Sequence, residues 1–170
     1  MSEIDLRPVR RADAQDLIDA NRASADHHHP WVEPFTDMDG FEAWFGEIAT
    51  GAKVALIARE PGSGGVVGVV NLNQIFAKGF QNAYLGFYGM TGFEGRGLMT
   101  RALKLAIVHA FAEIGLHRLE ANVQPDNARS LALVRRVGFR KEGFSPRYLK
   151  VGGVWRDHER WAILADEVEP

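Results

Sequence analysis

Three apolar runs rich in β-branched residues precede a glycine-rich stretch and a long, mostly apolar segment in the middle of this sequence. The runs cover 53–60, 64–75 and 82–90, the glycine-rich stretch FEGRGLMT covers 93–100, and the segment LMTRALKLAIVHAFAEI covers 98–114. PGSG between the first two runs predicts a hairpin turn. The long segment predicts a helix that is buried against a sheet and closed by Gly115. The order of these segments predicts a sheet in which the third strand, 82–90, is followed by a glycine turn and then by a buried helix.

The flanking segments predict further strands and helices. Strands are expected at 5–11, 117–123, 139–151 and 154–164, and helices at 12–26, 37–49 and 126–138. The spacing in 12–26 places Leu17 and Ile18 inward, and Asp13, Asp16 and Asp19 outward.

Cap residues mark several of these helix ends. Asp37 is a candidate N-cap, Asp126 and Asn127 precede the last helix, and Gly138 followed by Phe139 suits a Schellman ending. Strands outnumber helices and adjacent strands are joined by short turns. The expected class is therefore α/β in the broad, α+β sense: a mixed, mostly antiparallel central sheet with helices on both faces.

Composition excludes several functions. The 170 residues are 46% hydrophobic, which suits one domain over 1–170. The net charge of −2 offers no global attraction for nucleic acid or an anionic membrane. No cysteine is present, so disulfides, cysteine-based zinc sites and thiol nucleophiles are excluded. With no apolar signal core and no run of about 20 apolar residues, we expect a cytoplasmic protein.

The glycine-rich stretch is a candidate anion site. A glycine turn between a strand and a helix exposes N–H groups beside the positive end of the helix, which suits a phosphate. The dinucleotide fingerprint fails because Thr100 stands where a third glycine is needed, and the P-loop fails at Leu98 and Met99. From this stretch alone, a tight turn with glycines for packing is an equal alternative.

The run GFYGMTGFEGRGLMTRAL (86–103), followed by NARSLALVRRVGF (127–139), resembles the GCN5-related N-acetyltransferase (GNAT) superfamily, and more narrowly its ribosomal-protein alanine/serine branch. In that superfamily the pattern (Gln or Arg)-x-x-Gly-x-(Gly or Ala) holds the pyrophosphate of acetyl-coenzyme A (acetyl-CoA); Gly95 and Gly97 match it, whereas Gly92 departs from it. The other matching motifs are His117-Arg118, Asn127-x-x-Ser130, Gly138-Phe139-x-x-Glu142-Gly143, Gly153-x-x-x-Asp157-His158, and upstream Asn21-Arg22 and Pro30-Trp31. The resemblance covers nearly the whole chain.

The resemblance implies a sheet that splays beside the glycine loop and a direct acetyl transfer from acetyl-CoA to an amine. Ser130 is implied as the proton donor to the leaving thiolate; its other interpretation is an ordinary first-turn helix residue. Residues implied to bind the cofactor are Phe87, Tyr88, Gly89, Met90, Gly92, Phe93, Glu94, Gly95, Arg96, Gly97, Leu98, Met99, Asn127 and Ser130.

The attacking amine must be neutral, and the pKa of an α-amine, about 7.7 to 8.0, is far below the lysine value of about 10.4. Glu120 is the candidate base, because alternation places it with Asn122 on one side of its strand. A solvated or ion-paired carboxylate is the more common state of such a residue. The resemblance implies that Arg22, Trp31 and Phe35 border the acceptor entrance, although Trp31 is equally a candidate core aromatic. Further acceptor-binding candidates are Tyr84, Asn122 and Tyr148.

Three functional alternatives stay open. The acceptor is expected to be a protein α-amine, for example that of a ribosomal protein, with a small-molecule amine as the second enzymatic reading. The third alternative is a non-catalytic module that binds acetyl-CoA or a ribosomal protein. A homodimer is compatible with each. His27, His28 and His29 are consecutive and point in different directions, so we expect no metal site.

Overall fold

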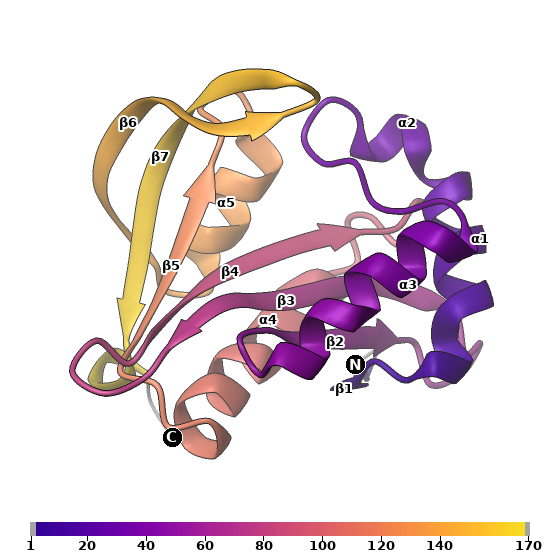
Figure 1. Ribbon diagram of the computed structural model, residues 1–170, viewed down its shortest axis with the longest axis horizontal. Coiled ribbons are helices and arrows are strands. Elements are labelled where there is room, and N and C mark those ends of the chain that lie inside the picture. The colour runs from indigo at the N-terminus through magenta and orange to yellow at the C-terminus, as the bar shows by residue number, and fades with distance from the viewer. Residues whose placement is uncertain (1–2, 169–170) are drawn as a thin grey trace.

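The computed structural model describes residues 3–168, and its centre is a seven-stranded sheet in the order β1-β2-β3-β4-β5-β7-β6 (Figure 1). The strands are β1 (Asp5–Pro8), β2 (Val54–Arg59), β3 (Val66–Phe76), β4 (Asn82–Gly89), β5 (Arg118–Val123), β6 (Arg140–Val151) and β7 (Val154–Leu164). All neighbours are antiparallel except β4 and β5. The expected mixed, mostly antiparallel sheet is confirmed.

The parallel strands β4 and β5 diverge after a short pairing. Their register runs from Asn82 opposite Arg118 to Tyr84 opposite Glu120 and stops there, although β4 continues to Gly89 and β5 to Val123. Figure 1 shows the two strands separating from a common point. This gap is the splay that the family resemblance implied, and it leaves one edge of β4 without a neighbouring strand over its second half.

Helices cover both faces of the sheet. The α-helices are α1 (Ala14–Ala23), α2 (Ala25–His28), α3 (Met38–Gly46), α4 (Leu98–Val108) and α5 (Ala128–Arg136). Short 3₁₀ segments lie at Arg11–Asp13, Glu47–Thr50 and Ala165–Glu167, and a π-helical turn at His109–Glu113 extends α4. None of the helices within residues 3–168 is long and apolar enough to span a membrane.

Two buried clusters correspond to the two faces. The first joins α4 and α5 to the sheet and includes Leu103, Leu119 and Val134. The second joins α1 and α3 to the opposite face and includes Leu17, Ile18 and Phe41. The apolar positions expected to point inward in 12–26 are therefore buried as predicted. The helix expected at 12–26 is divided at Ser24 into α1 and α2, and His27 and His28 are the last two residues of α2.

The expectation that Asp13 faces outward is wrong. Asp13 is 3% exposed and accepts hydrogen bonds from Arg7 at 2.8 and 2.7 Å and from Arg59 at 3.0 Å. It lies in the 3₁₀ turn before α1, not in the helix whose periodicity placed it outside. Arginines from β1 and β2 converge on it, so the carboxylate is buried with its counter-charges.

Candidate active site

The glycine loop lies between the end of β4 and the start of α4. Gly92, Gly95 and Gly97 have φ angles of +90°, +72° and +73°, and a Cβ on any of them would meet no atom within 4 Å. The backbone conformation, not lack of space, therefore requires glycine here. Within the described chain, the N–H groups of Gly95 and Gly97 have no hydrogen-bond acceptor. The loop presents free donors at the N-terminus of a buried helix, which suits a phosphate.

Two charged side chains of the loop are already engaged. The Glu94 carboxylate accepts the Gly92 N–H at 2.7 Å and lies 3.5 Å from Nδ1 of His27. Backbone N–H groups, those of Glu94 and Gly92, lower the pKa of Glu94. Arg96 forms an ion pair with Glu60. An arriving anion would therefore compete with Glu60 for Arg96.

The end of β4 turns part of its backbone toward the splay. The Met90 N–H donates to the Val67 carbonyl at 2.8 Å, and Tyr88 lies opposite Val69. N–H groups alternate in direction along an antiparallel strand, so those of Phe87 and Gly89 point away from β3. A Cβ on Gly89 would lie 3.3 Å from Met99, which shows how closely α4 approaches the strand.

His28 fixes the last peptide of β4. It is buried, and its Nε2 lies 2.8 Å from the Gly89 carbonyl oxygen. Burial lowers the pKa of His28, and the adjacent His27 adds to the effect, while the Gly89 carbonyl opposes it. The second histidine of the HHH run thus has a structural partner in the sheet. No group of three or more metal-binding side chains is found among residues 3–168.

Stability should consequently decrease in mild acid. The unfolded chain takes up a proton on His28 as pH falls through about 6.5, whereas the folded chain resists it, so the free energy of unfolding declines below that pH. Urea unfolding of the wild type and His28→Gln at pH 7.5 and 5.5 measures this. We expect a smaller pH dependence in His28→Gln, with exposed His29→Gln behaving like the wild type; equal dependence in all three would contradict the assignment.

The first turn of α5 carries the expected proton donor. Asn127 is the N-cap, and its Oδ1 accepts the Ser130 N–H at 3.2 Å. The amide NH₂ of Asn127 is then the end left for a ligand. Ser130 is half-buried, and its hydroxyl forms no hydrogen bond within the described residues. α5 follows β5, the strand that bounds the other side of the splay.

Glu120 is held in an ion pair on the face of β5 opposite to Leu119 and Ala121. Its Oε1 lies 2.9 Å from Arg118 Nε, and Arg118 also binds Glu142. Tyr84 lies opposite Glu120, and burial raises the pKa of Tyr84, with the charge of Glu120 and the nearby Tyr148 adding to it. Leu119 and Ala121 are buried on the other side of β5, as the alternation predicted. Of the two states considered for Glu120 from the sequence, a base or an ion-paired carboxylate, the structure shows the ion pair.

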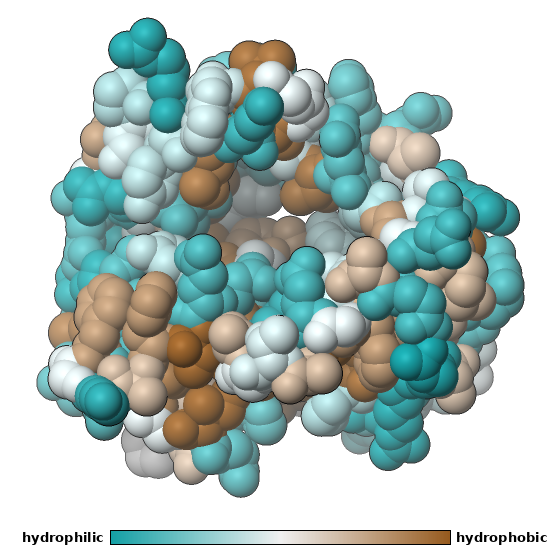
Figure 2. All heavy atoms as spheres, in the orientation of Figure 1, coloured by the Kyte–Doolittle hydropathy of each residue, from teal (hydrophilic) through white to brown (hydrophobic). Residues whose placement is uncertain are grey.

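A cavity of about 490 Å³ lies beside this face, over β3 and β4. Figure 2 shows the surface hollowed between the β6–β7 hairpin and α3. Residues lining the cavity are Val32, Glu33, Pro34, Phe35, Gly40, Ala43, Trp44, Glu47, Asn71, Gly86, Phe87 and Tyr88.

The acceptor candidates are divided by this geometry. Phe35 lines the cavity, whereas Trp31 and Arg22 do not; Arg22 instead donates to the Thr36 carbonyl at 2.7 Å. Asn122 is half-buried, and its Oδ1 has no partner within residues 3–168. Asn71 and Trp44 also line the cavity but were not among the acceptor-binding candidates predicted from the sequence. The polar Asn71 within the apolar run 66–72 was the available signal.

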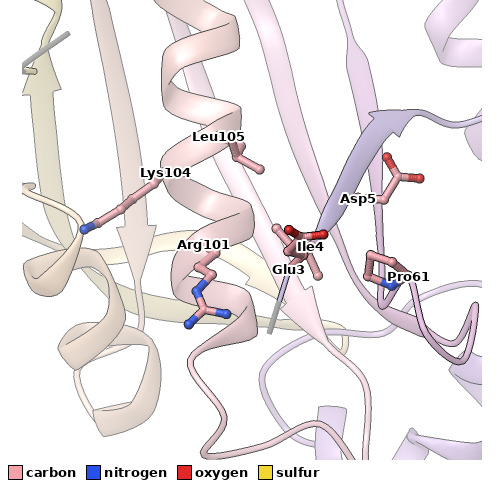
Figure 3. Close-up of a pocket in the computed structure, with 7 residues that line it drawn as sticks. All are labelled: Glu3, Ile4, Asp5, Pro61, Arg101, Lys104 and Leu105. Atoms are coloured by element: carbon pink, nitrogen blue, oxygen red, sulfur yellow. The ribbon is translucent and has the colours of Figure 1, made fainter. Parts of the chain in front are cut away.

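A second cavity, of about 540 Å³, lies between α4 and β1 on the other face (Figure 3). It is lined by Glu3, Ile4, Asp5, Pro61, Arg101, Lys104 and Leu105. None of the residues expected to bind cofactor or acceptor belongs to it, so it is separate from the candidate active site.

A sheet that splays at β4, a glycine loop at the end of that strand and a buried helix behind the loop define the class of protein. Residues 3–140 match the family model described as the acetyltransferase (GNAT) domain. The chain belongs to this family; it is an N-acetyltransferase and uses acetyl-CoA.

Two relatives are similar to this chain over nearly its whole length. The chain is 32% identical to [ribosomal protein uS5]-alanine N-acetyltransferase of Escherichia coli (strain K12), over 97% of this chain and 89% of that protein. RimJ of Mycobacterium smegmatis, solved in complex with CoA-disulfide, superposes with a TM-score of 0.83 at 33% identity, covering 98% and 84% of the two chains.

Other relatives match over shorter stretches. The probable N-acetyltransferase YjcK of Bacillus subtilis (strain 168) is 39% identical over 61% of this chain, and the match spans 58% of YjcK. A spermidine N(1)-acetyltransferase of Escherichia coli (strain K12) is 32% identical over 42% of this chain and 39% of its own length.

A substitution in the loop tests its role in cofactor binding. Gly97→Val places a β-branched residue at a φ of +73°, so the free loop should relax to another conformation that binding must reverse. We expect the Kd for acetyl-CoA to rise about tenfold or more, while kcat at saturation changes far less. Calorimetric titration measures the Kd, and Gly62→Val, at a turn without positive φ, is the control. An unchanged Kd would argue against the loop as the cofactor site.

Proposed function

We propose that this enzyme transfers the acetyl group of acetyl-CoA to the N-terminal α-amine of a protein, by direct attack within a ternary complex. The observation that carries the proposal is the splay between β4 and β5, which ends at the glycine loop. It leaves β4 backbone donors free beside a phosphate-suited turn. The named action of the Escherichia coli relative on ribosomal protein uS5 supports a ribosomal protein as the acceptor.

The chemistry assigns a task to each part of the site. The amine lone pair attacks the thioester carbonyl carbon, and the resulting oxyanion accepts hydrogen bonds from the Phe87 or Gly89 N–H. Collapse breaks the carbon–sulfur bond, and the thiolate takes a proton from the Ser130 hydroxyl, whose oxygen regains a proton from solvent. The thiolate is a tolerable leaving group because a thiol pKa is about 8.5, so a weak acid suffices.

The proton released by the amine goes to solvent or to Glu120. An α-amine, with a pKa of about 7.7 to 8.0, is partly neutral near neutral pH and needs little help from a base. Glu120 is paired with Arg118 at 2.9 Å, so its carboxylate is already engaged by a counter-charge. An acceptor that needs no strong base fits this arrangement better than a lysine side chain.

Free-thiol release from acetyl-CoA tests the proposal. Peptides beginning with Ala, Ser or Met would be compared with N-terminally blocked, lysine-containing versions and with small amines that include spermidine. Release with free-α-amine peptides alone is expected. Release with small amines alone would move the function to small-molecule modification, and tight cofactor binding without turnover would favour a binding module.

A further inference from the structure

Asn71 is a buried polar side chain whose Oδ1 accepts no hydrogen bond from residues 3–168. It lies in the middle of β3, opposite Ala55 of β2 and Gly86 of β4. Its exposed fraction is 9%. Leaving such a group unsatisfied costs about 1–3 kcal/mol, so a partner is expected to reach it in the working complex.

Asn71 is one of the residues that line the cavity over β3 and β4, so a ligand in the cavity lies against its side chain. Asn71 and Gly86 lie side by side in its lining, and a Cβ on Gly86 would lie 4.0 Å from Asn71 Cβ and 3.2 Å from Asn73 Nδ2. Glycine therefore keeps the floor open beside the amide. Gly86 directly precedes Phe87, about 3.4 Å along the strand, so a group bound to Asn71 is next to the proposed reaction centre.

The chemistry of the cavity favours a neutral amide over a polyamine. Two carboxylates line it, but Glu47 is paired with the buried Lys53 at 2.9 Å, and Lys53 also lies 5.2 Å from the Trp44 ring centroid. The negative charge available to a polycation is thus largely that of Glu33. A side-chain amide carries one acceptor and one donor group, the same pair that a peptide bond presents.

We infer that Asn71 recognises the first peptide bond of the acceptor and thereby distinguishes a peptide N-terminus from a simple amine. The inference rests on the proposed function, and the substrate feature that it adds is the first peptide bond of the acceptor. The apolar walls, Val32, Phe35 and Trp44, then face the side chains that follow the acetylated residue.

A peptide and its matched depsipeptide test the inference. In the depsipeptide an ester oxygen replaces the first peptide N–H of an Ala-starting peptide, while the α-amine is retained. One lost hydrogen bond lowers kcat/KM about tenfold, so the wild type should favour the peptide by that factor. Asn71→Leu should lose about tenfold on the peptide and nothing further on the depsipeptide, the signature of a coupled pair.

Asn82→Leu is the matched control, because Asn82 is also buried and unpartnered within residues 3–168 but does not line the cavity. Asn82→Leu should keep the wild-type preference for the peptide over the depsipeptide. The Kd for acetyl-CoA and the Tm of each variant show whether it is folded. If Asn71→Leu fails to fold, the wild-type ratio still tests whether the first peptide N–H is recognised. Peptide and depsipeptide acetylated equally by the wild type would overturn the inference and leave the proposed function standing. Acetyl-CoA binding without acetylation of any peptide would overturn the proposed function itself.

Discussion

Replacing Ser130 with alanine is expected to lower kcat by about 100-fold or more, the usual contribution of a positioned general acid. The reason is that the Ser130 hydroxyl forms no hydrogen bond within the described residues and is left free to donate to the leaving thiolate. The Kd for acetyl-CoA should change little, because the glycine loop and the Asn127 amide remain in place. Single-turnover kinetics and calorimetric titration measure the two quantities separately.

The control for Ser130 is Ser63→Ala, which removes a hydroxyl bonded to Glu60 in the turn between β2 and β3. It should keep full turnover. The helix cap survives in Ser130→Ala because Asn127 accepts the backbone N–H of residue 130, not its hydroxyl. Full turnover in Ser130→Ala would show that another group, or water, protonates the thiolate.

Replacing Asp13 with alanine is expected to reduce the free energy of unfolding by about 3–5 kcal/mol, because it leaves partly buried arginines without their counter-charge. Arg7 and Arg59 both donate to Asp13, and the Arg10 N–H adds a bond at 2.8 Å. Urea unfolding at pH 7 measures the loss. Asp19→Ala, whose exposed carboxylate accepts from Gln15, is the control and should change stability by less than about 0.5 kcal/mol.

The same carboxylate should make the wild type sensitive to acid. Hydrogen bonding from Arg7 holds the pKa of Asp13 well below its ordinary value of 3.8. Its contribution to stability is present above that value and is lost as pH falls further. Asp13→Ala should therefore lose less stability than the wild type between pH 4 and pH 2. A parallel decline in both proteins would contradict the assignment.

The sequence alone determined the elements whose signals are local. Asp37 caps α3 through the Gly40 N–H, Gly115 has a positive φ after the long helix, and Gly138 with Phe139 forms the predicted Schellman ending. Hairpin turns at 61–64 and 152–153 also lie where glycine indicated them. Each depends on atoms a few residues apart, so the chain order carries the information.

The separation of β4 and β5 was expected from the family resemblance and not from a local signal. The alternation along 117–123 predicted which side chains of β5 share a face, and the burial of Leu119 and Ala121 confirms it. The family resemblance implied that the sheet splays beside the glycine loop, but no pattern in the sequence marks Tyr84 as the last paired residue. The glycines at 92, 95 and 97 pointed to the loop, and their positive φ angles give the physical reason.

Contacts between distant segments were decided by the tertiary structure alone. Asp13 was assigned to the surface by helical periodicity, yet arginines from β1 and β2 enclose it. Arg118 draws Glu120 into an ion pair shared with Glu142 of β6, and α3 closes a cavity over Asn71. The burial and pairing of a charge or amide depend on which segments the fold packs against it, and spacing along the chain does not contain that information.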